Sequence, residues 1–181
     1  MNKLLAVLAA ILFAASTSFA QWGTTGTTTL SVTVAAEAEL EINTATTTFS
    51  TSANTFADYT GTTNLGFRVR TGAAGGSSGT ITLQITSDFA PTGGPTFGGT
   101  QLTAGDNPTY ICGASSMTAA TPCSGTITPS LTASQPVYSF GANAHSQKAG
   151  DTGAVTWTVP NDPLYPVNTY HATATFTISA T

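Results

Sequence analysis

The stretch from Thr27 to Ile42, TTTLSVTVAAEAELEI, alternates apolar and polar side chains without interruption. Successive side chains of a β-strand point to opposite faces, so this period of two predicts an extended strand. At about 3.3 Å per residue, a strand from Leu30 to Ile42 would span on the order of 40 Å. A compact chain of this length is also on the order of 40 Å wide. The apolar face carries Leu30, Val32, Val34, Ala36, Ala38, Leu40 and Ile42.

This long N-terminal strand has two interpretations, because most strands contain only about five or six residues. The strand either stays in its own domain and bends from one sheet to the other near Ala35-Ala36, or it is shared between two subunits. In the second case, the part from Ala36 to Ile42 pairs within its own subunit and the earlier part pairs with the next. The predicted subunit interface then consists of Trp22, Leu30, Val32 and Val34.

The first twenty residues, MNKLLAVLAAILFAASTSFA, have the composition of a secretory signal peptide. Lys3 is followed by an apolar run, and the segment ends on Ser18-Phe19-Ala20, where small residues precede the expected cleavage. The apolar run is shorter than the about 20 residues of a membrane span, so we expect no membrane span after cleavage. The mature chain is predicted to begin at Gln21, with a flexible leader over residues 21–29 and one domain over residues 30–181.

The composition after the signal is neutral and rich in hydroxyl groups. Charged residues make up 7% of the chain and the net charge is -4. Arg68, Arg70 and Lys148 are the only Lys and Arg residues after Lys3, so binding to nucleic acid would gain little from counterion release. A nucleic-acid partner is therefore not expected.

Short alternating runs separated by Gly, Pro, Asn and Ser fill the rest of the chain. Examples are NLGFRVRT, TITLQIT, AVTWTVP and YHATATFTISAT. Such strands, divided by turn residues, predict an all-β fold: a single immunoglobulin-like or Greek-key β-sandwich, mainly antiparallel. The GAAGGSSG segment, residues 72–79, is predicted to join two neighbouring strands as a hairpin loop.

Two cysteines, Cys112 and Cys123, lie in YICGASSMTAATPCSG. In an exported protein a close pair of this kind predicts a disulfide. A redox or metal site would require CxxC spacing or additional Cys and His ligands, and neither accompanies this pair.

The sequence contains no convincing catalytic or metal-binding motif. The segment GGSSG around Ser77 matches the nucleophile pattern G-x-S-x-G, but a predicted strand follows it where that motif requires a helix. His145 and His171 have no partner at metal-ligand spacing. The aspartates Asp106, Asp151 and Asp162 are predicted to lie in turns, where Asp commonly bonds to its own backbone. We therefore expect no enzyme activity, no metal and no cofactor.

The charged residues that do occur are arranged with a period of two. Glu37, Glu39 and Glu41 share the polar face of the long strand, and Arg68 and Arg70 share the polar face of another. If the two strands are neighbours, cross-strand ion pairs form; otherwise the arginines meet glutamates of another copy. An acidic edge that discourages unwanted pairing is equally consistent with the pattern.

The two ends of the chain together resemble a known class of protein. The long alternating first strand, the ending TVPNDPLYPVNTYHATATFTISAT and Tyr170, which is predicted to open the final strand, are similar to secreted pilin-like β-sandwich proteins of bacteria. These include the spore coat U type domain and chaperone-usher pilins. The chain differs in having Asn168 where the family often has Gly, and in lacking a Cys in the first strand. The resemblance implies an incomplete sandwich that is completed by a strand of another subunit, with a periplasmic chaperone as a candidate partner.

The predicted function is that of an exported structural subunit of a surface filament, pilus or coat, which self-associates by donating its N-terminal strand. It would be secreted or displayed on the cell surface, passing through the periplasm in a Gram-negative cell. The alternative is a monomeric, secreted carbohydrate-binding module or adhesin. Its sugar-binding aromatic residues would be Tyr59, Phe89 and Phe97, which lie beside Gly- and Pro-rich loops.

Overall fold

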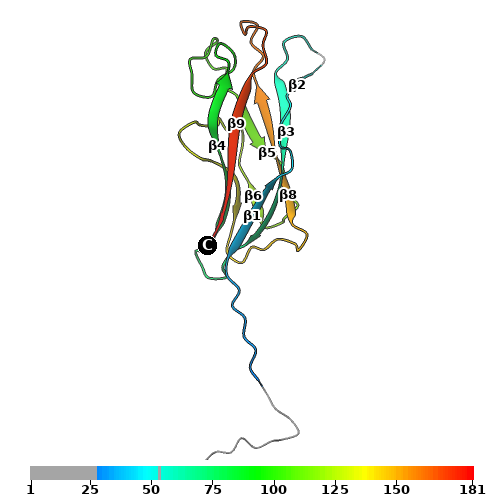
Figure 1. The fold of residues 1–181 in the computed structure, drawn as a ribbon, viewed down its shortest axis with the longest axis vertical. Helices are drawn as coiled ribbons and strands as arrows, with labels where there is room; N and C mark the ends of the chain where they lie inside the picture. The colour runs from blue at the N-terminus through cyan, green and yellow to red at the C-terminus, as the bar shows by residue number, and fades with distance from the viewer. Residues whose placement is uncertain (1–27, 53) are drawn as a thin grey trace, which may run out of the picture. The chain divides into compact units, whose positions relative to one another are not determined.

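The computed structural model describes residues 28–52 and 54–181. The predicted signal peptide, Trp22 and most of the predicted leader lie outside these residues. The chain divides into two units, residues 1–33 and residues 34–181. All strands of the described residues belong to the second unit (Figure 1). They are β1 (Glu37–Ile42), β2 (Ser50–Thr51), β3 (Tyr59–Arg70), β4 (Gly79–Ala90), β5 (Thr109–Cys112), β6 (Ala120–Pro122), β7 (Gln135–Phe140), β8 (Asp151–Val159) and β9 (His171–Ala180).

The strands form two antiparallel sheets that pack face to face as a β-sandwich, which confirms the predicted fold class. Sheet A has the order β1-β3-β8-β5, with β2 also paired to β3. Sheet B has the order β6-β7-β4-β9. The described residues contain no helix.

The core between the sheets consists of the apolar positions of the alternating runs. Each strand of the sheet interior turns every second side chain inward and leaves Thr, Ser, Asn or Arg outside. This arrangement buries Leu65, Phe67 and Val69 of β3, Ile81, Leu83 and Ile85 of β4, and Val155, Trp157 and Val159 of β8.

The strand at the N-terminus is shorter in the structure than the alternating pattern. β1 pairs with β3 from Glu37 opposite Arg70 to Ile42 opposite Leu65, while residues 28–36 belong to no strand. β3 ends at Arg70, so the residues before Glu37 have no further strand to pair with on that edge. Pairing within the subunit therefore covers Glu37–Ile42, one residue less than the predicted Ala36 to Ile42.

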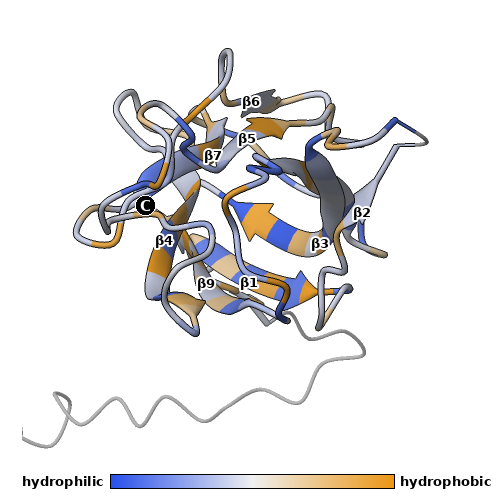
Figure 2. Cartoon of the chain, turned by 90° about the horizontal axis from the view of Figure 1, so that it is seen from above, coloured by the Kyte–Doolittle hydropathy of each residue, from blue (hydrophilic) through white to orange (hydrophobic). Residues whose placement is uncertain are grey.

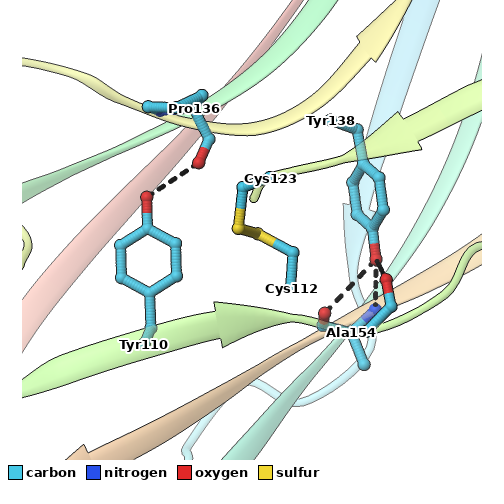
Figure 3. The surroundings of a disulfide bond; sticks show 7 residues. Tyr110, Cys112, Cys123, Pro136, Tyr138 and Ala154 are labelled. Atoms are coloured by element: carbon cyan, nitrogen blue, oxygen red, sulfur yellow. Dashed lines mark hydrogen bonds between the residues drawn. A yellow bond between two sulfur atoms is a disulfide. The ribbon is translucent and has the colours of Figure 1, made fainter. Parts of the chain in front are cut away.

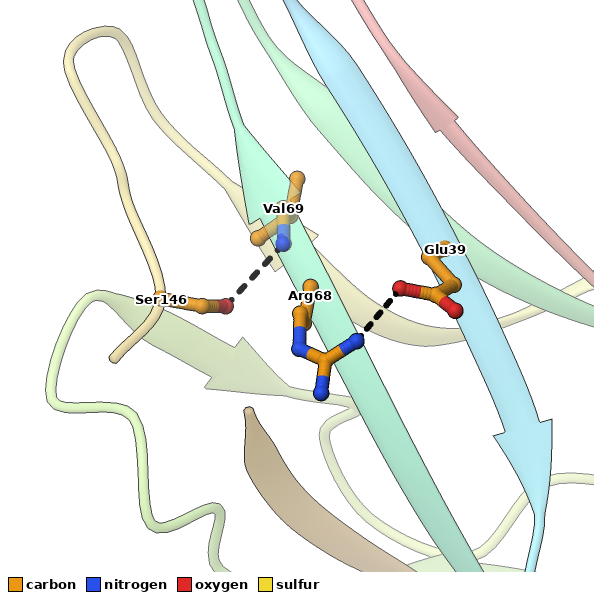
Figure 4. Close-up of polar contacts among 4 residues, drawn as sticks. All are labelled: Glu39, Arg68, Val69 and Ser146. Atoms are coloured by element: carbon orange, nitrogen blue, oxygen red, sulfur yellow. Dashed lines mark hydrogen bonds and ion pairs between the residues drawn. The ribbon is translucent and has the colours of Figure 1, made fainter. Parts of the chain in front are cut away.

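Two ion pairs join β1 to β3. Of the alternatives left by the sequence, the Glu and Arg runs therefore lie on neighbouring strands of the same subunit. The Arg68 Nη1 lies 2.8 Å from the Glu39 Oε2, and the Arg70 Nη2 lies 2.7 Å from the Glu37 Oε2. All four side chains are exposed, so each pair contributes at most about 1 kcal/mol and acts mainly on register. Figure 4 shows the first pair, together with the Val69 N–H that donates to the Ser146 Oγ (3.0 Å) on the other side of β3.

The loop of residues 71–78 is not a hairpin, contrary to the prediction. It carries the chain from β3 in sheet A to β4 in sheet B, because β1 and β8 already occupy both edges of β3. Thr71 fixes this crossing: it is buried, its hydroxyl donates to the Gly141 carbonyl (2.7 Å), and it accepts from the Ala144 N–H (2.8 Å). The alternating pattern identified both strands but could not assign them to a sheet.

Candidate functional site

A disulfide joins the two sheets along one side of the sandwich. Cys112 ends β5 of sheet A, and Cys123 follows β6 of sheet B, with a Cα–Cα distance of 5.4 Å (Figure 3). The cysteine pair predicted from the sequence is therefore bonded. It connects strands of opposite sheets at the β5/β6 side.

Two buried tyrosines beside the disulfide also connect the sheets (Figure 3). The Tyr110 hydroxyl on β5 donates to the Pro136 carbonyl on β7 at 2.8 Å. In the opposite direction, the Tyr138 hydroxyl on β7 donates to the Gly113 carbonyl (2.8 Å) and accepts from the Ala154 N–H (3.0 Å). Together with the disulfide, these bonds close the β5/β6 side of the sandwich.

Burial of these rings predicts a loss of stability in alkali. Burial raises the pKa of Tyr110 from 10.0 to about 12, and it also raises the pKa of Tyr138, against a smaller lowering by the hydrogen bond with Ala154. An unfolded tyrosine ionises near pH 10, so the contribution of Tyr110 is complete below pH 10 and is lost as the pH rises towards about 12. We expect the free energy of unfolding, measured by urea titration at several pH values, to fall across this interval.

Tyr110→Phe should make that decline shallower, since it removes a group that ionises only in the unfolded chain. It should also cost about 1 kcal/mol at neutral pH, because the hydrogen bond to Pro136 is lost. Tyr59→Phe, at the exposed start of β3, is the matched control and should retain the full decline. An alkaline decline that is identical in Tyr110→Phe and in the unsubstituted chain would contradict this assignment.

The side formed by β1 and β9 is only partly closed, because these two strands approach each other without pairing. These two strands are terminal in their sheets, and Figure 2 shows them on the side of the sandwich away from β5 and β6. The inward side chains of β9, Ala174, Phe176 and Ile178, are only half-buried. The corresponding side chains of β4, which is covered by strands on both edges, are 0 to 1% exposed. The core is therefore incompletely covered along β9.

A groove of about 610 Å³ opens on this side, between the first half of β9 and the segment of residues 42–49 that follows β1. Its lining combines apolar side chains with six threonines and comes from parts of the chain that are far apart in sequence. The large apolar side chains that line it are Ile42, Phe49, Ile85, Phe89, Phe97, Trp157 and Phe176.

The floor of the groove has its polar atoms paired. The Trp157 Nε1–H donates to the Thr63 Oγ1 at 2.9 Å, and that hydroxyl also pairs with the Thr47 Oγ1 at 2.5 Å. No buried side-chain nitrogen or oxygen atom of the described residues lacks a hydrogen-bond partner. The floor therefore presents mainly ring and methyl surface, which suits an apolar occupant better than a charged one.

Asp88, at the end of β4, fixes the loop that forms one wall of the groove. Its carboxylate accepts from the N–H groups of Phe89 and Phe97 (both 2.8 Å) and from the Thr96 hydroxyl (2.6 Å). Partial burial acts to raise the pKa of Asp88, but these hydrogen bonds outweigh it and the pKa lies below its ordinary value. Asp88 was not among the predicted site residues, although an Asp before a Gly- and Pro-rich loop is a known turn signal.

The predicted interface residues are exposed where the structure describes them. Leu30 is 90% exposed, Val32 is 86% exposed and Val34 is 61% exposed, and none of them belongs to a strand. Trp22 lies outside the described residues. The structure therefore places three large aliphatic side chains of one alternating segment in solvent.

The structure brings together two of the three aromatic residues considered for sugar binding. Phe89 and Phe97 stack on each other with ring centroids 5.1 Å apart, and Phe97 also meets Trp157 edge-on at 6.4 Å. Tyr59 is not among the residues that line the groove. Because Phe89 and Phe97 face each other, one face of each ring is already covered.

The residues weighed for catalysis occupy ordinary structural positions. Ser77 is followed by β4, so the helix required by the nucleophile motif is absent there. The His145 Nδ1 lies 3.0 Å from the Asn143 carbonyl oxygen, and Asp162 accepts from the N–H of Leu164 (2.8 Å) in its own turn. The turn predicted for Asp151 is wrong: this residue begins β8 and is buried, because its carboxylate accepts from the Ser116 hydroxyl (2.8 Å) and from the Gln147 N–H (3.1 Å). His171, at the start of β9, lines the groove. No Asp or Glu side chain lines the groove beside it.

Residues 28–52 and 54–181 contain neither a candidate metal site nor a candidate membrane-spanning helix. No group of three or more His, Cys, Asp or Glu side chains there could hold a metal ion. No helix in this part of the chain is long and apolar enough to cross a membrane. Comparisons with protein-family models, with curated proteins and with solved structures found no significant match for the chain.

Proposed function

We propose that the chain is an exported structural subunit of a surface filament, pilus or coat, and that it assembles by donating residues Leu30–Val34 to the next subunit. The observation that carries this proposal is the exposed alternating segment directly before β1. Its apolar face is solvated, although it has the composition of a strand that covers a core.

The energetics favour a buried partner for this segment. Covering Leu30, Val32 and Val34 would contribute on the order of 5 to 8 kcal/mol before the cost of ordering the chain. An extended segment that joins a sheet also gains backbone hydrogen bonds, and these fix its direction and register. A contact in which each copy gives a strand and receives another does not close on itself, so it propagates into a fibre.

Other features of the chain suit a role outside the cell. The first twenty residues resemble a signal peptide, and a disulfide between the sheets is typical of an oxidising compartment. The solvent face of sheet B is lined with hydroxyl groups that pair across strands, as between Thr86 and Thr175 (3.1 Å). This neutral surface fits a structural role better than recognition of a charged partner.

The test uses the chain from Gln21 onwards and substitutions on the two faces of the donated segment. Val32→Asp places a carboxylate on the apolar face and should leave a folded, soluble monomer that forms no fibres in electron microscopy. Thr33→Asp adds the same charge to the opposite face and is the matched control, which should still polymerise. Deletion of residues 21–34 should behave as Val32→Asp does, because residues 34–181 form a separate compact unit.

Normal fibres from Val32→Asp would reject strand donation. A chain that stays monomeric at high concentration and shows glycan-array binding, lost in Phe89→Ala or Phe97→Ala, would instead support the carbohydrate-binding alternative. A misfolded product after deletion of residues 21–34 would indicate that the segment belongs to its own domain.

A further inference from the structure

We infer that the groove beside β9 is the acceptor: residues 30–34 of a second copy bind there by adding a strand to the free edge of β9. This inference rests on the proposed strand donation and assigns the surface that receives the strand. It follows from a comparison of the sheet edges, from the chemistry of the groove and from the reach of the chain.

Among the sheet edges of the described residues, the first half of β9 is the least protected against strand addition. β9 has ten residues, pairs on one side with β4, and carries no Asp, Glu, Lys or Arg. Its other edge pairs with no strand, although β1 of the opposite sheet lies close to it, and the groove opens beside residues 171–176. The edge of β1 is shorter and carries Glu37, Glu39 and Glu41, and charges on an edge discourage pairing. The terminal strands β5 and β6 have only four and three residues. A long, uncharged edge such as β9 is the expected site of β-augmentation.

The donated segment matches both faces of this edge. Its apolar side chains, at every second position from Leu30 to Val34, would enter the half-covered space above Trp157 and beside Phe176. Its outward residues Ser31 and Thr33 would extend the solvent face of β9, where Thr and Ser already alternate. Hydroxyl pairs between neighbouring strands already occur on this face, as between Thr80 and Ser179 (3.1 Å).

Residues 30–34 of the same copy do not reach the floor of the groove. The Ala35 carbonyl accepts a hydrogen bond from the Arg70 Nε at 2.8 Å, which fixes Ala35 at the end of β3. Thr63, at the floor of the groove, lies seven residues earlier on β3, about 23 Å away along the strand. Leu30 is five residues before Ala35, so it can lie at most about 18 Å from Ala35. A strand that fills the groove as far as this floor therefore comes from a second copy.

The experiment pairs a variant that cannot donate with one that cannot accept, both in the full chain from Gln21. Val32→Asp blocks donation, and Ala174→Asp places a carboxylate inside the groove on β9. Thr177→Asp, on the solvent face of the same strand, is the matched control. Ala172→Asp is a second acceptor variant at an exposed position that lines the groove, chosen to preserve folding. Melting temperature and circular dichroism establish that each variant is folded.

Each blocked variant alone should sediment as a monomer, and Thr177→Asp should polymerise. An equimolar mixture of Val32→Asp and Ala174→Asp should form a dimer that grows no further, because only one donor and one acceptor remain functional. A synthetic peptide of residues 28–36, TTLSVTVAA, should shift the NMR signals of Ala172–Phe176 in the Val32→Asp chain. The same peptide carrying Val32→Asp should leave them unchanged.

The outcomes separate the two proposals. If Val32→Asp prevents assembly but both acceptor variants polymerise normally, strand donation stands and the groove is not the acceptor. If the mixture stays monomeric, or if the peptide shifts only β1 signals, the acceptor assignment is likewise overturned. If Val32→Asp itself polymerises, strand donation fails, and the inference fails with it.

Discussion

Replacing Trp157 with alanine should lower the free energy of unfolding by about 3 to 5 kcal/mol, the usual range for truncating a buried aromatic side chain. Trp157 is 4% exposed, and its ring packs 5.5 Å from that of Tyr110 and 6.4 Å from that of Phe97. Its removal leaves a cavity that opens into the groove, and Thr63 loses the indole N–H. Urea denaturation of the chain carrying Val32→Asp, which is not expected to polymerise, would measure the change.

Two further variants test the origin of this effect. Trp157→Phe retains most of the apolar contact but not the hydrogen bond to Thr63, so its cost should be clearly smaller. Ile111→Ala is the exposed control on the neighbouring strand β5, where the side chain is 48% exposed, and it should change stability little. Equal losses in Trp157→Ala and Ile111→Ala would show that Trp157 is not part of the core.

Removing the disulfide by Cys112→Ser together with Cys123→Ser should cost roughly 2 to 4 kcal/mol of stability, because the unfolded chain gains conformational freedom. Assembly should be unaffected, since the disulfide closes the β5/β6 side while the groove lies along β9. The hydrogen bonds of Tyr110 and Tyr138 still connect the sheets in this variant. The measurements are urea denaturation and electron microscopy of fibres.

The unsubstituted chain under reducing conditions provides the control for this variant. Its stability should match that of the double variant, because both lack the same covalent bond. A loss of fibres with no change in the stability of the subunit would contradict the prediction and would place the β5/β6 side in an assembly contact.

The inward faces of the strands could be predicted from the sequence because burial follows a local period of two. Leu65, Ile81 and Val155 lie in alternating runs, and each is completely buried. The cysteine pair was also predictable, since it depends on spacing and compartment more than on topology. The pattern also allowed the strand with Glu37 and Glu39 to lie next to the strand with Arg68 and Arg70, but it did not distinguish this arrangement from pairing with another copy.

The sheet assignment and the groove could not be predicted, because they depend on contacts between distant residues. The loop after β3 looks like a hairpin loop, but both edges of β3 are taken by strands that lie before and much later in the chain. β1 starts at Glu37 because β3 ends opposite it, at Arg70. The groove combines Phe49, Phe97, Trp157 and Phe176, and no local pattern indicates that these residues meet.

The antiparallel ladder between β1 and β3 has a mechanical consequence for a filament assembled as proposed. Tension between subunits would enter each domain through residues 30–35 and leave it through the groove, which lies beyond the other end of β1. The load would therefore run parallel to β1 and would shear all its hydrogen bonds to β3 at the same time. A force perpendicular to the strand would instead break these hydrogen bonds one after another. The ion pairs of Glu37 with Arg70 and of Glu39 with Arg68 also join β1 to β3, so they would resist the same displacement. Such a joint resists extension while the strand itself remains only six residues long.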